Sequence, residues 1–330
     1  MPMDGAACRI FPASNFLTAR YAVNYKGTSH KRFPWALCTV KNQIFFETPM
    51  PDLHYIPHRN YVKKKGRLPI LIVIPHGGCR VPEELSGYQA VNDFDLFIQS
   101  DSCANEIYSF GNRVTGTINT DISRLFMDLD RPYTALPPAQ DGVLKKSTLF
   151  GKPVFRGDIF PDEIAISNML HRYYFPFHQA IKKIIDTGGI RLILECHTMM
   201  AVGPVQSPDA WKPRPTVLLE HRAGGGTSSE GAGERDLAES LMGCLEKPFS
   251  GEEGTTAGKF IVRIDPSPGY ILNSYGAAGT PMIRLSLSRS LFINDRFFSY
   301  EYLRVDDLRI RDLRDMMWEG IEKFFDKNLA

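Results

Sequence analysis

Two unbroken apolar runs constrain the fold of this chain more than any other feature. LPILIVIP at 68–75 and RLILEC at 191–196 place apolar residues at consecutive positions. A strand with this pattern is buried on both faces, which is typical of a parallel sheet with helices on its two sides. A sheet with one face in water would show alternation instead. We therefore expect a mainly parallel, doubly covered sheet.

The segments around these runs alternate between helix and strand patterns. Helices are expected over 94–111, 161–187, 234–247 and 301–327, with a kink at Pro176 in the second. Strands are expected at VTGTIN, PTVLLE (215–220), KFIVRI and PMIRLSLSRSLF, and a long Pro-, Gly- and Lys-rich loop over 133–160. This order predicts an α/β fold with three layers, α/β/α, and a mainly parallel mixed sheet. Residues 1–66 lack the pattern, so we expect an N-terminal extension, irregular or hairpin, followed by one domain over 67–330.

Composition excludes several classes of protein. The 330 residues carry a formal net charge of +2, which gives no footprint for nucleic acid or an anionic membrane. The six cysteines form no CxxC pair, so we expect a reducing, cytoplasmic setting. We see no signal peptide in MPMDGAACRIF and no apolar stretch long enough to span a membrane. Oligomeric state is not indicated.

A histidine follows each apolar run: His76 after ILIVIP and His197 after RLILEC. Ligands of open α/β sheets bind beyond the carboxyl ends of the strands, so both side chains are expected in one crevice. Neutral imidazole is the commonest metal ligand, and catalytic zinc takes three protein ligands and a water. Glu83, Glu84 and Asp101 are the candidates for the third ligand. Two hydrogen-bonded structural histidines remain the alternative.

The segment DISRLFMDLDR, 121–131, carries two arginines seven positions apart. Arg124 and Arg131 bracket Asp128 and Asp130. A guanidinium is suited to bind a carboxylate through two parallel hydrogen bonds. A salt-bridged surface turn is the other interpretation.

A series of motifs resembles the N-formylglutamate amidohydrolases. PHGGCRVPEEL, DSCANEIY, ISRLFMDLDRP, STLFGKPVF, RYYFPFHQAI, LECHTM and GYILNSYG occur in the order seen in that family, from about Leu68 to the C-terminus. The family belongs to the zinc-carboxypeptidase and aspartoacylase-like group, whose members cleave amide bonds with one zinc ion. The resemblance therefore implies a zinc-exopeptidase-like fold and a small-molecule substrate with a carboxylate, such as N-formylglutamate.

The resemblance also implies roles for individual residues. His76 and His197 match zinc-binding histidines of the family, and Asp101 matches an acidic residue that would be the third ligand, with Glu84 as the alternative. Arg131 would hold the substrate carboxylate with help from Arg124. His178 matches a family histidine that either supports the site or only packs.

Three departures from the family pattern affect the chemistry. Asp130 stands where the family has asparagine, which places a negative charge beside the proposed carboxylate site. Ser286 stands where the family has a glutamate suited to be the general base, and a hydroxyl has no useful basicity near pH 7. Glu195 replaces an aspartate two residues before His197, and strand alternation puts both on one face.

These residues predict a zinc-dependent amidohydrolase with Glu195 as general base or as a residue that supports His197. The alternative is a non-catalytic or impaired binding protein on the same fold, which Ser286 favours. A third interpretation is an amidase for a different acylated substrate, with Asp130 selecting a cationic group.

Overall fold

A six-stranded sheet forms the centre of the computed structural model, which describes residues 38–40, 43–45, 68–137, 141–157, 159–223, 230–252, 260–276 and 279–329. Its order is β4-β3-β5-β8-β6-β7. The strands are β3 (Leu68–Ile74), β4 (Val114–Asn119), β5 (Leu192–Met199), β6 (Val217–His221), β7 (Phe260–Ile264) and β8 (Met282–Ser288). All neighbours pair in parallel except β6 with β8. The prediction of a mainly parallel mixed sheet is confirmed.

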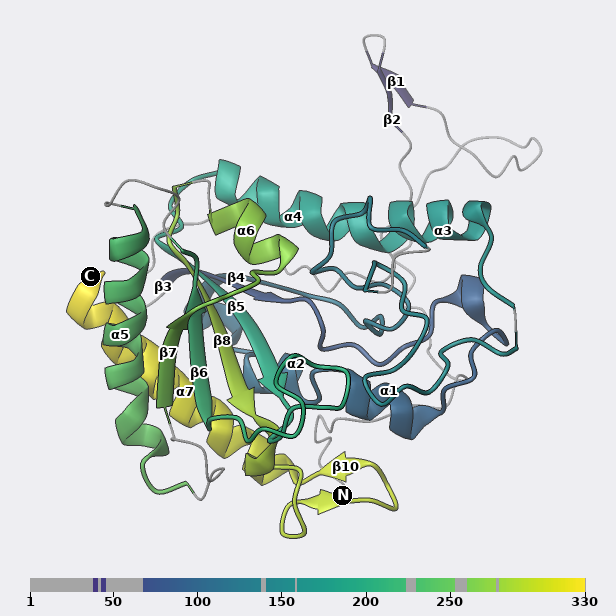
Figure 1. The fold of residues 1–330 in the computed structure, drawn as a ribbon. Coiled ribbons are helices and arrows are strands. Elements are labelled where there is room, and N and C mark those ends of the chain that lie inside the picture. Colours follow the sequence, from purple (N-terminus) through teal and green to yellow (C-terminus); the bar gives the residue numbers. More distant parts are fainter. Residues whose placement is uncertain are drawn as a thin grey trace, which may run out of the picture. The chain divides into compact units, whose positions relative to one another are not determined.

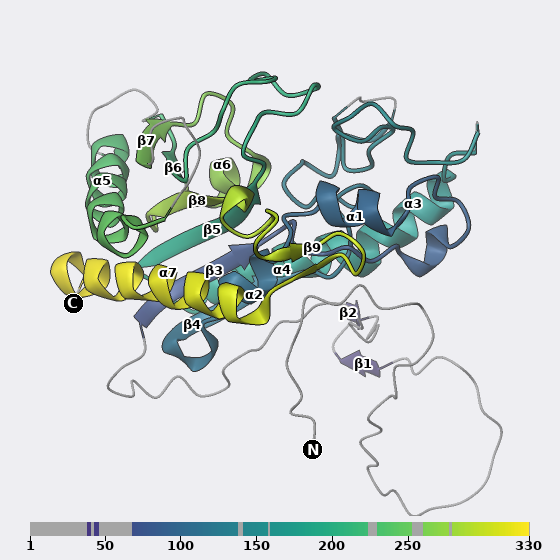
Figure 2. The same cartoon turned by 90° about the horizontal axis from the view of Figure 1, so that it is seen from below.

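Helices cover both faces of the sheet (Figure 1). On one face lie α2 (Ala104–Ile107), α5 (Glu230–Phe249) and α7 (Asp307–Asn328), and on the other α3 (Glu163–Met169), α4 (Phe175–Asp186) and α6 (Tyr270–Gly276) (Figure 2). Strand β3 serves both cores, because Ile70 and Ile72 face one and Leu71 and Val73 face the other. Each such side chain contributes roughly 1.5–3 kcal/mol by burial. The three-layer prediction is confirmed. Burial of β3 on both faces explains why its apolar run is unbroken.

The predicted helix over 161–187 forms with one irregularity. A π-helical turn, Leu170–Tyr174, joins α3 to α4 immediately before Pro176. Proline has no N–H and its ring clashes with the carbonyl four residues earlier, so the widened turn accommodates it within the helix.

The prediction of one helix over 94–111 is wrong. Helix α1 (Asp93–Gln99) ends at Ser100, and α2 begins only at Ala104. The hydroxyls of Ser100 and Ser102 both donate to the Phe97 carbonyl, and Cys103 has a left-handed φ of 60°. Side-chain bonds of this kind compete with the helical ladder and end it. The break places Asp101 outside both helices.

Shorter elements complete the described chain. They are the antiparallel pair β1 (Cys38–Val40) and β2 (Gln43–Phe45), the pair β9 (Phe298–Ser299) and β10 (Arg304–Val305), and short helices at Glu83–Leu85, Gly111–Arg113 and Arg289–Leu291. The β1–β2 pair is a separate two-stranded sheet. Because most of residues 1–67 lie outside the described part, the domain boundary at 66/67 stays a prediction.

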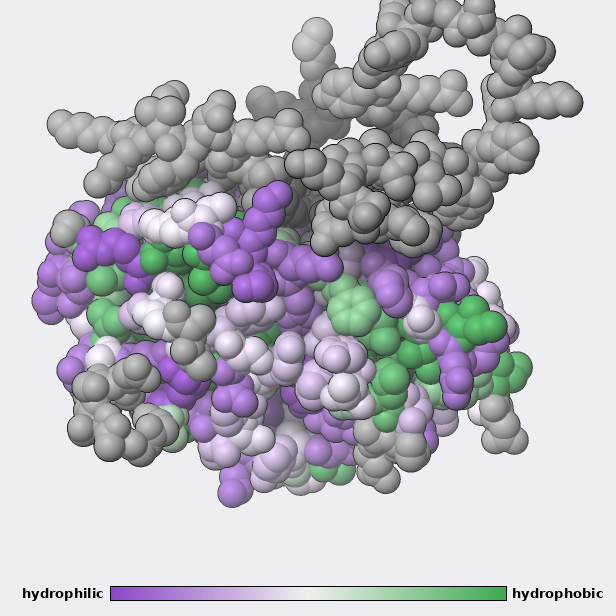
Figure 3. Space-filling view, turned by 90° about the horizontal axis from the view of Figure 1, so that it is seen from above, coloured by the Kyte–Doolittle hydropathy of each residue, from purple (hydrophilic) through white to green (hydrophobic). Residues whose placement is uncertain are grey.

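The surface carries mixed polarity. Figure 3 shows hydrophilic side chains over much of the face that carries α3 and α4, with a group of hydrophobic ones toward α3. Ile164 on α3 is exposed, whereas Ile166 and Met169 on the same helix are buried. Among the described helices, none combines the length and apolar character needed to cross a membrane.

Candidate metal centre and adjoining cavity

The two predicted histidines lie on neighbouring strands. After β3 the chain adds β4 on one side of it and then crosses to add β5 on the other side. The carboxyl ends of β3 and β5 therefore lie at a switch point of the sheet. His76 follows β3 after Pro75, and His197 lies inside β5, which continues beyond the predicted end to Met199. Their ring centroids are 5.2 Å apart. The expectation that they meet in one place is thus confirmed by geometry.

Glycine fixes the turn that follows His76. A Cβ on Gly78 would lie 2.1 Å from the backbone carbon of Asp121, because residues 78–80 pair closely with 121–123. Only glycine permits this approach. The turn thereby holds His76, which is 2% exposed, against the carboxyl end of the sheet.

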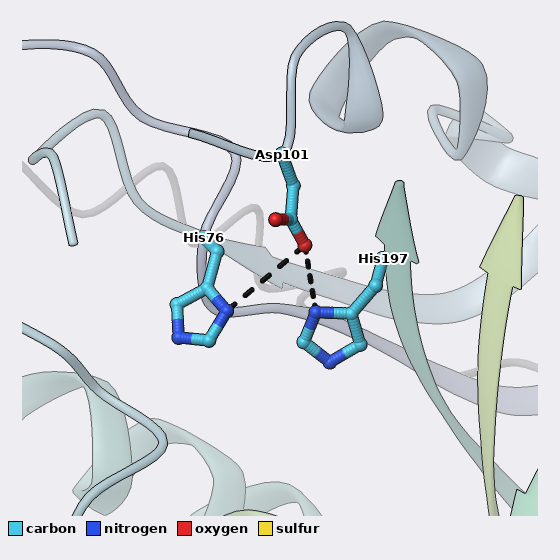
Figure 4. A group of neighbouring side chains, drawn as sticks. All are labelled: His76, Asp101 and His197. Carbon is cyan, nitrogen blue, oxygen red and sulfur yellow. Dashed lines mark hydrogen bonds and ion pairs between the residues drawn. The ribbon is translucent and has the colours of Figure 1, made fainter. Parts of the chain in front are cut away.

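Asp101 joins the two histidines. Its Oδ2 is 2.7 Å from Nδ1 of His197 and 4.0 Å from Nδ1 of His76 (Figure 4). The Asp101 N–H donates to the His76 carbonyl at 2.8 Å, which ties the helix break to the turn after β3. All three side chains are buried, and their ligand atoms lie within 4.8 Å of one another. The structure therefore brings together the three residues predicted as metal ligands.

The tautomer of His76 suits a metal ligand. Burial, reinforced by Arg124, lowers the pKa of His76 to about 4, so the ring is neutral at pH 7. Although burial raises the pKa of Asp128, the Lys145 ammonium holds it well below its usual range, so the carboxylate is charged. The 2.8 Å bond between them therefore needs the proton on Nε2 of His76. Its Nδ1 keeps a lone pair and has no hydrogen-bond partner among the described residues.

His197 is held from both sides by carboxylates. Nδ1 contacts Asp101, and Nε2 contacts Oε1 of Glu195 at 2.9 Å. Burial lowers the pKa of His197, but these two hydrogen bonds outweigh it and raise the value to about 9. Binding of a metal at Nδ1 would require that proton to leave. A carboxylate on the remote ring nitrogen, as on His76 and His197, is the usual support of metal-binding histidines.

Glu195 lies behind His197 rather than beside the three-residue cluster. The strand-alternation prediction holds, since Glu195 and His197 share a face and a hydrogen bond. Oε1 also accepts from Nη2 of Arg284 at 3.1 Å, and the side chain is fully buried. This is the geometry of a residue that orients an imidazole, while its role as general base stays a prediction.

Ser286 occupies the strand position next to His197. The β5–β8 register pairs these two residues directly, so their side chains point the same way from the sheet. Ser286 is buried, at 6% exposed. The departure from the family pattern therefore falls next to a candidate metal ligand.

Asp130 is paired with Arg284, whose side chain is 13% exposed. Oδ2 of Asp130 accepts from Nη2 of Arg284 at 2.9 Å, and Oδ1 accepts from the Ile271 N–H at 2.8 Å. Arg284 also donates to Asp265 at 2.8 Å. Asp130 is thus a structural partner of Arg284, which answers the concern that it faces the substrate uncompensated.

The two predicted arginines line one cavity of about 760 Å³. Its other lining residues are Gln99, Leu125, Asp141, Lys145, Lys146, Ser147, Leu149, Gln206, Ser207 and Pro208. Arg124 connects this cavity to the cluster, because it donates to Asp128 at 3.2 Å and lies 4.0 Å from Asp101. Arg131 bonds to Asp141 instead.

Two further candidates have other partners. Glu84 accepts from the Tyr173 hydroxyl at 2.8 Å and from Arg172 at 3.3 Å, so the described structure gives it no part in the cluster. His178 contacts the Leu129 carbonyl at 3.1 Å and the Tyr275 hydroxyl at 3.0 Å. It therefore supports the 128–131 segment from helix α4.

Sequence reasoning missed the residues that hold the ligands. Asp128 had been interpreted only as part of a charged turn, and Arg289 was not singled out. Arg289 is buried and donates to the Ile98 carbonyl at 2.7 Å. Its Nη2 also donates to Oδ1 of Asp101 at 3.4 Å. The sequence did offer a signal for these partners, since Arg284 lies within a largely apolar strand and Arg289 directly after it. A cation that is covered by the fold requires acidic partners nearby.

Comparison with known proteins places the chain in a family. A profile of N-formylglutamate amidohydrolases matches residues 68–293. N-formylglutamate deformylases of Pseudomonas putida and Pseudomonas aeruginosa are 24% and 26% identical over 143 and 149 residues, which is 41% and 43% of this chain. These matches span 53% and 56% of the relatives, so the chain covers about half the length of the curated relatives that it matches.

Solved structures show the same fold. A crystal structure of N-formylglutamate amidohydrolase from Ralstonia eutropha JMP134 has a TM-score of 0.59 at 17% identity, over 84% of this chain and 99% of that one. A gene product of Agrobacterium tumefaciens has a TM-score of 0.55 at 15% identity, over 79% and 91%. With a family profile that matches more than half of its length, the chain belongs to the N-formylglutamate amidohydrolase family.

Proposed function

We propose that this protein is a metal-dependent amidohydrolase that cleaves the amide bond of an N-formyl or N-acyl amino acid such as N-formylglutamate. The observation that carries the proposal is the buried cluster of His76, Asp101 and His197 beside a cavity lined by arginine. Family membership and the names of the Pseudomonas relatives support the same reaction.

The donor set fits one zinc ion. Two imidazole nitrogens and one carboxylate oxygen leave a coordination position for water or substrate, as in catalytic zinc sites. A zinc ion bound there would supply Lewis-acid chemistry for an amide carbonyl and lower the pKa of a water to about 7. The unpartnered Nδ1 of buried His76 supports this assignment.

The other residues have roles in binding and orientation. Asp128 and Glu195 fix the rings of His76 and His197 through their Nε2 atoms. Arg124 and Arg131 line the cavity as cations for the substrate carboxylate. Glu195 is retained as candidate base, although its contact with His197 favours orientation of that ring.

A metal analysis tests the proposal most directly. Purified protein should contain about one zinc ion per chain by mass spectrometry. His76→Ala and His197→Ala should both lose it, whereas His171→Ala, which changes an exposed histidine on the π-helical turn, should keep it. Formate release from N-formyl-L-glutamate should follow the metal. Stoichiometric zinc in His197→Ala would refute the ligand assignment.

Ser286 favours one second candidate, a binding protein that retains the metal but lacks turnover. It takes the place of the family's glutamate next to His197. Wild-type protein that binds zinc without releasing formate, and that gains activity on Ser286→Glu, would support this alternative. Activity in the wild type that is lost on Glu195→Gln with metal retained would instead support Glu195 as base.

A further inference from the structure

Among the described residues that line the cavity, four are cations and one is a carboxylate. The cations are Arg124, Arg131, Lys145 and Lys146, and the carboxylate is Asp141. Asp130, the acid that the sequence suggested as a selector of charge, does not line this cavity and is buried against Arg284. If an acid among the described lining residues discriminates between charged substrates, that acid is Asp141.

Asp141 binds two of these cations with both of its oxygens. Oδ2 accepts from Nε of Arg131 at 3.1 Å and from Nη2 at 2.5 Å, and Oδ1 accepts from Nζ of Lys145. The remaining Nη1 of Arg131 donates to the Asp130 carbonyl. A carboxylate that engages a guanidinium and an ammonium in this way uses the same groups that a substrate carboxylate would use.

The backbone near Asp141 is anchored to the site. Val143 and Leu144 are fully buried. The Asp128 N–H donates to the Val143 carbonyl at 2.7 Å, and the Lys145 N–H donates to the Leu125 carbonyl at 3.0 Å. The Asp141 side chain is nevertheless 65% exposed, against 28% for Arg131 and 10% for Lys145. The two cations are therefore fixed in the wall, and the carboxylate that joins them faces solvent.

We propose that Asp141 is a specificity-determining residue that competes with the substrate carboxylate for Arg131 and Lys145. The inference rests on the proposed function, in which Arg131 binds that carboxylate. An anionic substrate has to displace Asp141 and bear its repulsion, so Asp141 lowers affinity for anions and leaves that for neutral molecules unchanged. Its exposure makes displacement cheap, because an exposed ion pair is weak.

Calorimetric titration with glutarate tests this competition. Asp141→Asn should bind glutarate roughly five- to tenfold more tightly than wild type, the gain expected from loss of the ion pairs that Asp141 makes with Arg131 and Lys145 and of its repulsion of the ligand. Binding of uncharged glutaramide should not change. Asp186→Asn is the matched control, because it makes the same charge change in an exposed Lys182 pair that does not line the cavity. The gain should be smaller when Arg131→Gln is added, because Arg131 then no longer contributes to it while Lys145 still does.

Equal or weaker glutarate binding by Asp141→Asn would overturn the inference, since it would make Asp141 a support for the cations. A gain that Arg131→Gln leaves undiminished, or that Asp186→Asn reproduces, would also overturn it. Metal content and formate release of the same preparations report on the proposed function separately. Normal zinc and turnover without a gain in glutarate affinity would leave the proposed function standing.

Discussion

The site has two ends that are built differently. At the candidate metal end, His197 and Glu195 are buried on strand β5, and Arg284 on β8, 13% exposed, donates to Glu195 and Asp130. At the carboxylate end, Arg131, Lys145 and Asp141 lie outside the sheet, and their exposure rises toward solvent. The clearest contrast is between the carboxylates, because Glu195 is fully buried whereas the Asp141 side chain is 65% exposed. The residues around the candidate ligands are therefore held on several sides, while Asp141 can be displaced at lower cost.

The largest difference between the two ends should be in stability. Arg284→Met leaves the carboxylates of Asp130, Glu195 and Asp265 without their buried cation. We expect a loss of about 3–5 kcal/mol in the free energy of unfolding, against less than about 1 kcal/mol for Arg131→Met. Urea denaturation of both variants measures this. Equal losses of unfolding free energy in the two variants would contradict the expected difference between the two ends of the site.

His178 gives a pH-dependent test of the helix that supports the carboxylate end. Burial lowers its pKa to about 4 from an ordinary 6.5. Because the pKa of His178 is lower in the folded protein than in the unfolded chain, the neutral ring contributes fully to the free energy of unfolding above pH 6.5. That contribution is lost as the pH falls toward 4, by about 3 kcal/mol in all. Relative to wild type, His178→Gln should therefore become more stable on acidification. Denaturation at pH 7 and pH 4.5 measures the change, and parallel curves would contradict it.

Asp128 connects the two ends, because it contacts both His76 and Lys145. Asp128→Asn should weaken metal binding by roughly 10–100-fold, as loss of a carboxylate partner of a metal-binding histidine does. Chelator competition measures the affinity, with Asp186→Asn as control. Unchanged affinity would show that the backbone alone orients His76.

The smallest effect is expected in the loop 200–216. Asp209 accepts from Nε and Nη2 of Arg214 at 2.6 and 2.7 Å, but its side chain is 39% exposed. Asp209→Asn should cost no more than about 1 kcal/mol in the free energy of unfolding. If Asp209→Asn lost as much free energy of unfolding as Arg284→Met under the same conditions, the Asp209–Arg214 pair would matter for stability as much as Arg284 does.

The sequence predicted the metal end better than the carboxylate end. Apolar runs and the histidines after them indicate where strands meet, because side chains at the carboxyl ends of neighbouring strands converge. Asp101 was one of three acidic candidates from its position, and family resemblance then selected it. The helix break that frees Asp101 was not foreseen, because the apolar spacing of 94–111 continues across it. The partnership of Arg131 with Asp141 depends on loop conformation, for which the nine intervening residues offer no periodic signal.

Arg284 has a consequence for how sequences of this family can change. Two of the departures from the family pattern, Asp130 and Glu195, are both hydrogen-bonded to this one guanidinium. Transfer of Asp130 alone into a relative that has asparagine there and lacks Arg284 would bury an unpaired charge, and removal of the arginine alone would leave Asp130 without its cation, whereas Glu195 would keep its contact with His197. Asp130 and Arg284 are therefore expected to change together, and a homologue should have both residues or neither.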